Sequence, residues 1–161
     1  MVKQISWLGA LPQLVALGLA MLAGFLIVRN SNGTFFGAAV YLGYSFGSRM
    51  LIARDHRRGM QLVRGLEFEA AIPEFENSYK FFAKNSWIDR FRSVVLMSAS
   101  AMSYREMALC NIAFCYSQLG KGIEAVEYYQ RALKEFPNSG LAQSALRMIE
   151  SGAYTAKKSK V

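Results

Sequence analysis

The sequence predicts an all-α fold in which two transmembrane helices precede a short array of α-helical hairpins. Two observations predict it. The first 53 of the 161 residues carry three charged side chains, Lys3, Arg29 and Arg49, in a chain that is 53% hydrophobic. Beyond residue 58, apolar residues recur at the three- and four-residue spacing of amphipathic helices. We therefore expect a transmembrane helical hairpin at residues 1–53, a helical domain at 54–151 and a basic tail at 152–161.

The first element is an uncharged apolar run over 5–28, which as a helix would extend about 36 Å and cross the hydrocarbon core. After a turn at 29–33, a second run covers 34–48 and continues past Arg49 through 50–53. A cleaved signal peptide is the alternative. Because the first run is long, lacks a small-residue exit and precedes another apolar run, two membrane-spanning helices are favoured.

Small residues recur every four positions in both runs, the pattern that lets membrane helices approach closely. They are Ala16, Ala20 and Gly24 in the first run, and Ala39, Gly43 and Gly47 in the second. These rows can pack on each other or on the helix of a partner.

The distribution of arginine predicts the orientation. Arg29 alone occupies the turn, whereas Arg49, Arg54, Arg57 and Arg58 flank the end of the second run. Because cytoplasmic flanks are enriched in arginine, we expect a multi-pass protein of the cytoplasmic (inner) membrane with both termini in the cytoplasm. The same arginines beside anionic membrane lipid explain much of the net charge of +8, and no nucleic-acid-binding motif accompanies them.

The clearest soluble element is a pair of helices near the C-terminal end. A capping box at Ser103–Glu106 starts the first helix, which ends at Gly120. The second helix runs to Phe136 and is stopped by Pro137. Two antiparallel helices joined by a glycine turn make one repeat-sized unit.

This pair resembles the tetratricopeptide repeat (TPR) family, in particular its membrane-anchored bacterial members. The matching structural positions are Ala113, Tyr116, Gly120, Ala125, Tyr129, Ala132 and Pro137. Gly122 stands where the family usually has an aromatic side chain, so we expect looser packing there, with Ile123 compensating.

The resemblance extends to a weaker copy at about 52–85, with Gly59, Phe68 and Phe75 at matching positions. A connector helix is predicted at 86–102, the strong copy at 103–137 and a capping helix at 138–151. Because two repeats are few, we expect the array to find further cover from these helices, a second copy of the chain or a partner.

The resemblance also implies a groove that binds a protein segment, lined by the first helix of each repeat. In the strong copy the lining residues are Met107, Cys110, Phe114, Ser117 and Gln118. Cys110 and Phe114 occupy positions where a carboxylate clamp would need polar groups, so an apolar helix or extended segment is the expected ligand. Burial of these side chains within the domain is the alternative.

No arrangement of residues indicates catalysis. Cys110 and Cys115 are expected to be buried reduced thiols, and His56 is expected at the membrane interface. Glu67, Glu69, Glu74 and Glu76 are expected to form a solvated helix face. We expect no enzyme activity, catalytic residue, cofactor, metal or small-molecule substrate.

The sequence therefore predicts a membrane-anchored adaptor or scaffold that recruits a protein partner at the cytoplasmic face. The alternative is an integral accessory subunit of a larger transport or secretion complex, docked through the hairpin. Contacts with membrane lipid are expected in either case, and a homo-oligomer formed with a second copy of the chain is an open alternative. Nucleic acid is not an expected partner.

Overall fold

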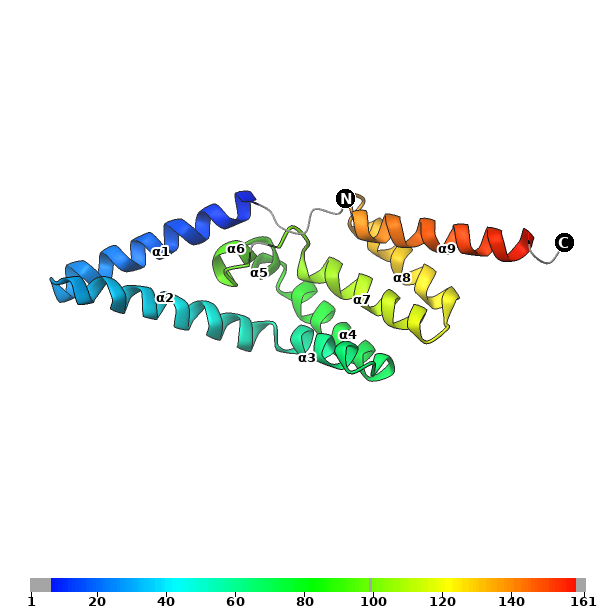
Figure 1. Ribbon diagram of the computed structural model, residues 1–161, viewed down its shortest axis with the longest axis horizontal. Coiled ribbons are helices and arrows are strands. Elements are labelled where there is room, and N and C mark those ends of the chain that lie inside the picture. Colours follow the sequence, from blue (N-terminus) through cyan, green and yellow to red (C-terminus); the bar gives the residue numbers. More distant parts are fainter. Residues whose placement is uncertain (1–6, 99, 159–161) are drawn as a thin grey trace. The chain divides into compact units, whose positions relative to one another are not determined.

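The computed structural model describes residues 7–98 and 100–158, whose regular secondary structure is α-helical, and so confirms the all-α class (Figure 1). The helices are α1 (Trp7–Val28), α2 (Ser31–Ile52), α3 (Arg54–Arg64), α4 (Phe68–Lys84), α5 (Ser86–Arg90), α6 (Arg92–Val95), α7 (Tyr104–Gln118), α8 (Gly122–Glu135) and α9 (Gly140–Lys158).

These helices form two compact units, each assembled from two separate stretches of chain. The hairpin unit contains residues 7–54 and the return segment, which we define as residues 85–103 and of which 85–98 and 100–103 are described. The described part of the repeat unit contains residues 55–84 and 104–158. The predicted domain division assigns 86–102 to the helical domain, whereas the structure groups this stretch with the hairpin.

Glycine brings the backbones of α1 and α2 into contact. A Cβ atom added to Gly24 would lie 2.8 Å from the backbone nitrogen of Gly37, closer than Cβ atoms approach other atoms. A Cβ atom on Gly33 would lie 2.8 Å from the carbonyl carbon of Gly24. Only glycine fits at this crossing, which is the close approach that small residues allow between apolar helices.

The apolar character of the two helices differs. Among the described residues, one stretch, Leu11–Val28, is long and apolar enough to cross a membrane, with a mean hydropathy of 2.2 and 6% of it buried. α2 has 22 residues, but Asn32, Thr34, its glycines and Arg49 lower its hydropathy. The prediction of two membrane spans is therefore not supported by composition. An apolar helix near the N terminus, such as α1, is typical of both a membrane span and a signal sequence.

The return segment folds against the hairpin through side chains of α2. Arg49 donates hydrogen bonds to the carbonyls of Leu96, from Nε at 2.9 Å, and of Met97. Tyr44 Oη donates to the carbonyl of Val95 at 3.2 Å, and α6 lies beside α1. The predicted single helix over 86–102 is wrong: α5 and α6 are short, and residues 96–98 and 100–103 are not helical.

The repeat unit has one central core between its two hairpins. α4 contributes Ala71, Ile72 and Phe75 to this core, and α7 contributes Ala108, Ile112 and Cys115. α9 follows α8 and begins after Ser139, whose Oγ accepts a hydrogen bond from the backbone N–H of Ala142 at 3.4 Å. The helix extends to Lys158, beyond the predicted cap at 138–151 and through most of the predicted tail; residues 159–161 lie outside the described part.

His56 belongs to the interior of the repeat unit. It is 8% exposed, and its ring makes edge contacts with Phe75 at 5.4 Å and Tyr104 at 5.2 Å between ring centroids. Its Nδ1 lies 3.4 Å from the hydroxyl of Ser78. The expectation of an interfacial histidine is therefore wrong, because the imidazole fills space between α3, α4 and α7.

Candidate protein-binding surface

The predicted repeat positions pack α7 against α8. Ala113, Ala125 and Ala132 are fully buried, and Tyr129 is 5% exposed. Small side chains at these positions let the two helices approach closely while Tyr129 fills the remaining space. The turn between them uses Gly120, whose φ of 73° lies in the left-handed region that favours glycine.

The outer positions of this hairpin are open. A Cβ atom on Gly122 would meet no atom within 4 Å, and Pro137 is exposed after the end of α8. Ile123 is 77% exposed, so the expectation that it compensates for the missing aromatic side chain is wrong. Tyr116 is partly buried and stacks on Tyr128, with 5.5 Å between ring centroids.

The five predicted groove residues lie in different environments. Cys110 is 2% exposed, and its Sγ lies 4.0 Å from Ser139 Oγ, so a partner cannot reach it without displacing α9. Phe114 is 38% exposed and makes an edge contact with Phe68. Ser117 donates a hydrogen bond to the carbonyl of Phe114 at 2.7 Å, Met107 is partly buried, and Gln118 is exposed. The solvent-facing part of the predicted groove is therefore centred on Phe114 and Gln118.

The two thiols are held in their protonated form. Burial raises the pKa of Cys110 to about 12 and that of Cys115 to about 11. Because a thiol reacts through its thiolate, neither is an activated nucleophile at neutral pH. Both cysteines act as small core residues.

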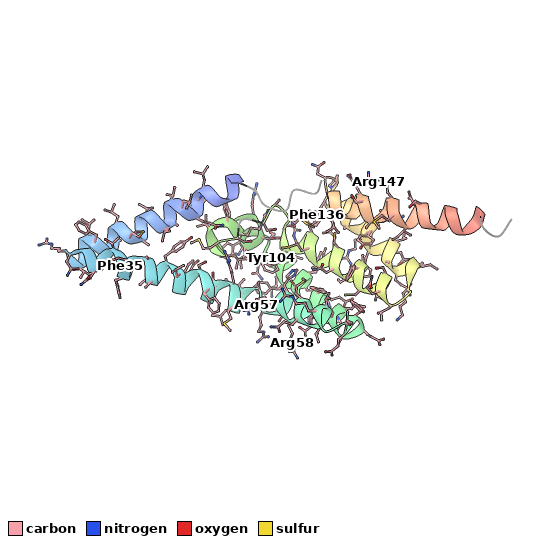
Figure 2. The ribbon with its side chains drawn as sticks, in the orientation of Figure 1. Phe35, Arg57, Arg58, Tyr104, Phe136 and Arg147 are labelled. Carbon is pink, nitrogen blue, oxygen red and sulfur yellow. The ribbon has the colours of Figure 1, made fainter. Side chains whose placement is uncertain are left out.

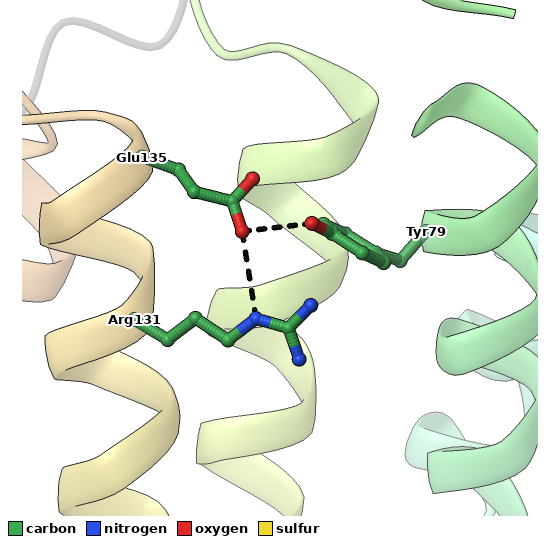
Figure 3. Close-up of polar contacts among 3 residues, drawn as sticks. All are labelled: Tyr79, Arg131 and Glu135. Atoms are coloured by element: carbon green, nitrogen blue, oxygen red, sulfur yellow. Dashed lines mark hydrogen bonds and ion pairs between the residues drawn. The ribbon is translucent and has the colours of Figure 1, made fainter. Parts of the chain in front are cut away.

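A second cluster, which the sequence did not reveal, links α4 to α8 (Figure 3). Tyr79 Oη donates to Glu135 Oε1 at 2.7 Å, and Arg131 Nε lies 3.4 Å from the same oxygen. The guanidinium carbon of Arg131 lies 4.6 Å from the centre of the Tyr79 ring, a cation–π contact. We call these three residues the inter-hairpin latch, because they join α4 of the α3–α4 hairpin to α8 of the α7–α8 hairpin.

Beside the latch, α8 lines a surface cavity of about 250 Å³ with Glu127, Tyr128 and Arg131. Tyr128 Oη donates to Glu76 Oε1 at 3.2 Å. Burial and the nearby Glu76 carboxylate raise the pKa of Tyr128, so its hydroxyl keeps its proton at neutral pH. Glu76 of α4 thus contacts α8, contrary to the expectation of a fully solvated glutamate face.

Sequence signals for this cluster existed but were nonspecific. Tyr128, Arg131 and Glu135 recur at three- and four-residue spacing on α8, which places them on one face. Nothing in that spacing specifies Tyr79, which is 56 residues from Glu135 along the chain.

The α3–α4 hairpin contributes a basic surface beside α7. Arg57 and Arg58 are exposed on α3, and Arg58 Nε lies 3.2 Å from Glu74 Oε1 (Figure 2). α3 and α7 are neighbours, since Asn111 Nδ2 donates to Met60 Sδ at 3.5 Å. Cationic side chains of α3 and the apolar Phe114 of α7 therefore belong to adjacent helices.

Comparison with protein families matches residues 107–139 to the tetratricopeptide repeat, about one fifth of the 161 residues. The match covers nearly all of α7 and α8, and it supports the resemblance stated above for this part of the chain. Tetratricopeptide repeats are protein-interaction modules, so the match indicates a protein-interaction role for this hairpin. Comparison with curated proteins and with solved structures gives no match to the chain.

Proposed function

We propose that this protein is a membrane-anchored adaptor. Its α3–α4 and α7–α8 hairpins bind a protein partner at the cytoplasmic face of the membrane. The single observation that carries the proposal is the combination of an apolar, outward-facing helical hairpin with a tetratricopeptide repeat on one chain.

Membrane anchoring is supported by the large apolar side chains that face outward on α1 and α2. Leu14, Leu26 and Ile27 of α1 are 66%, 62% and 78% exposed, and Phe35 and Leu51 of α2 are 76% and 79% exposed. Figure 2 labels Phe35 near the start of α2. Continuous apolar surface of this extent is unfavourable in water and is typical of a membrane-facing surface.

The same reasoning extends the anchor to α2, although its own hydropathy is below that of a span. Its backbone contacts α1 through Gly33 and Gly37, so insertion of α1 would carry α2 with it. A signal sequence would instead be removed. Intact mass of the purified protein separates these readings: retention of α1 gives 18.0 kDa, and cleavage gives a smaller chain.

The distribution of arginine residues supports a cytoplasmic location for the repeat unit. Arg54, Arg57 and Arg58 follow α2 directly, at the end opposite to the α1–α2 turn, where Arg29 stands alone. This asymmetry supports an orientation with the turn outside the cytoplasm and the repeat unit inside it. A cysteine-labelling or reporter assay that finds the repeat unit outside the cytoplasm would contradict this orientation.

The adaptor surface that we propose consists of Phe114 and Gln118 on α7 together with the exposed Arg57 and Arg64 on α3. Its chemistry suits a helix or extended segment that places an apolar side chain on Phe114 and acidic side chains toward α3. Tethering to a membrane would raise the local concentration of such a partner without further contacts.

A second candidate function is favoured by a different observation. Ala39 and Gly43 are exposed, and a Cβ atom on either Gly43 or Gly47 would meet no atom within 4 Å. This row of small residues on α2 is left uncovered by α1 and can receive the helix of another membrane protein. The chain would then be an integral accessory subunit of a transport or secretion complex, docked through the hairpin.

One experiment tests both candidates. The full-length protein is purified from its native membranes in mild detergent, and every protein that stays bound is identified and quantified. Four variants are compared with the wild type. Phe114→Glu tests the repeat surface and Ile123→Glu is its control, because Ile123 is exposed on α8. Gly43→Leu tests the α2 row and Gly18→Leu is its control, because both glycines border open space.

The adaptor function predicts substoichiometric partners that Phe114→Glu removes and Ile123→Glu retains. The accessory-subunit function predicts a stoichiometric membrane complex that Gly43→Leu disrupts and Gly18→Leu leaves intact. Unchanged co-purification with all four variants would contradict both functions. Thermal unfolding of each variant checks that lost binding does not result from misfolding.

A further inference from the structure

The return segment carries both buried and exposed apolar side chains. Ile88, Leu96 and Met97 belong to the hairpin unit and are 7%, 0% and 5% exposed. Trp87, Phe91 and Val94 are 58%, 56% and 47% exposed. These three large apolar side chains of the α5–α6 stretch are therefore open to the surroundings.

The segment lies level with the end of the hairpin that is opposite to its turn. Its hydrogen-bonding partners on α2 are Tyr44 and Arg49. Tyr44 is 13 residues after the start of α2, and Val15 is 13 residues before the end of α1. Because the helices run antiparallel from a two-residue turn, Tyr44 is approximately level with Val15, which belongs to the candidate span Leu11–Val28. The return segment therefore reaches the level at which that span begins.

Several backbone carbonyls at and after the end of α6 accept hydrogen bonds from protein side chains. The carbonyls of Val95, Leu96 and Met97 accept from Tyr44 and Arg49. Arg92 donates to the carbonyls of Asp89, Ser100 and Ala101, at 3.0 to 3.2 Å. Irregular backbone is tolerated near hydrocarbon only where protein groups satisfy it in this way.

We propose that the return segment is a third membrane-contacting element, with Trp87, Phe91 and Val94 seated at the boundary between lipid head groups and acyl chains. The occupant of this face is thus lipid. Trp is enriched at that boundary because its ring is apolar and its N–H is polar, and the neighbouring exposed Arg90 suits anionic head groups. The apolar outer faces of the segment and of α1 and α2 belong to one compact unit, so they can enter one leaflet together.

Because this inference rests on the proposed membrane anchor, the experiment reports on the two separately. The chain contains two tryptophans, Trp7 and Trp87. A Trp7→Phe variant keeps Trp87 as the sole tryptophan, and a Trp87→Phe variant keeps Trp7, which begins α1. Each full-length variant is reconstituted into vesicles of phosphatidylcholine and phosphatidylglycerol, and flotation measures membrane association.

The vesicles carry lipids brominated either near the head-group end or near the methyl end of the acyl chain, and fluorescence quenching of each tryptophan is measured. We expect the head-group-proximal bromines to quench Trp87 more strongly than the methyl-end bromines, and iodide in the buffer to quench it weakly. A further Phe91→Asp substitution in the Trp7→Phe background should reduce quenching by the lipid bromines and increase quenching by iodide.

Three results would overturn the inference. Quenching of Trp7 by brominated lipid without quenching of Trp87 leaves the anchor intact and places the return segment in water. Shielding of Trp87 from both bromine and iodide, in vesicles where Trp7 is quenched, identifies protein, such as a second copy of the chain, as the occupant. Failure of both variants to float with the vesicles contradicts the anchor itself, and the present inference with it.

Discussion

The inter-hairpin latch concentrates three interactions on the carboxylate of Glu135 and the ring of Tyr79. The hydroxyl of Tyr79 and the guanidinium of Arg131 share one oxygen of Glu135, while Arg131 also lies over the Tyr79 ring. The contacts are near the surface, so water competes with each of them. Their structural value is that they fix α8 relative to α4, which belongs to the preceding hairpin.

We predict that Tyr79→Phe lowers the free energy of unfolding by about 1 kcal/mol, the usual net contribution of one such hydrogen bond. The ring and its contact with Arg131 remain, so the change isolates the hydroxyl. Urea unfolding of the full-length protein in mild detergent measures the effect. In a Glu135→Gln background the same substitution should cost less, and equal costs in both backgrounds would contradict a direct coupling.

From the burial of the two thiols we predict how the protein responds to alkylating reagents and to pH. Since burial raises the pKa of Cys110 to about 12 and that of Cys115 to about 11, both should resist a maleimide at pH 8 until the protein unfolds. A pKa above the unfolded value of 9.0 means that the contribution to stability is complete below pH 9 and is lost as the pH rises toward 11 to 12. Labelling at pH 8 as fast as in urea would contradict this burial.

At the scale of elements, the contact between α1 and α2 depends on which glycines face the neighbouring helix. Gly24, Gly33 and Gly37 meet the opposite backbone, whereas Gly43 borders open space. Gly37 and Gly43 therefore lie on the same helix in contrasting environments, so substitutions at these two positions can be compared directly.

We predict that Gly37→Leu separates α1 from α2, because the new side chain would occupy backbone of α1, whereas Gly43→Leu leaves the hairpin intact. Overpacking commonly costs about 1–3 kcal/mol, and contact with backbone puts Gly37→Leu at or above the upper end. Hydrogen exchange followed by mass spectrometry should be faster across α1 and α2 in Gly37→Leu alone. Similar exchange in the two variants would contradict the observed crossing.

The sequence predicted the existence of this hairpin but placed part of the crossing incorrectly. Its pattern predicts a turn over 29–33, whereas Asn30 caps α2 by accepting a hydrogen bond from the N–H of Gly33 at 3.2 Å. Helix therefore begins at Ser31, and the row of Gly33 and Gly37 meets α1. Whether a short polar stretch ends as turn or as helix depends on one side-chain cap, which periodicity does not detect.

The second repeat hairpin was predictable because its determinants are local. The cap, the glycine turn and the small residues of α7 and α8 lie within residues 103–137. The return segment was not predictable, because its partners Tyr44 and Arg49 are 47 to 51 residues away in the sequence. The prediction of the groove failed at Cys110 for the same reason. The spacing correctly assigns Cys110 to a helix, but its burial depends on Ser139 at the start of α9.

For the molecule as a whole, the hairpin unit and the repeat unit alternate along the chain. Along the sequence the return segment separates the two stretches of the repeat unit, although it belongs to the hairpin unit. Removing the hairpin therefore does more than remove an anchor, because it leaves the apolar inner face of the return segment without its partner helices.

We predict that a chain limited to residues 55–161 self-associates in detergent-free buffer. Leu96 and Met97, which are 0% and 5% exposed in the full-length protein, would lose their cover together with Ile88. Size-exclusion chromatography should give a broad, high-mass profile. Replacing these three residues with serine should restore a monomer, and a monodisperse monomer without the replacements would contradict the dependence on the hairpin.

The alternating order also constrains synthesis on the ribosome. The hairpin unit can be completed only after residue 103 has emerged, and α4 must wait for α7 before Phe75 is covered. At roughly 5–20 residues per second, the 34 residues from Lys84 to Gln118 take about 2–7 s to be made. During that interval α3 and α4 form a nascent helix pair with an uncovered apolar side, at the stage when chaperones can bind it. Neither unit can mature before the other has begun, so translation speed over this stretch should influence the yield of folded protein.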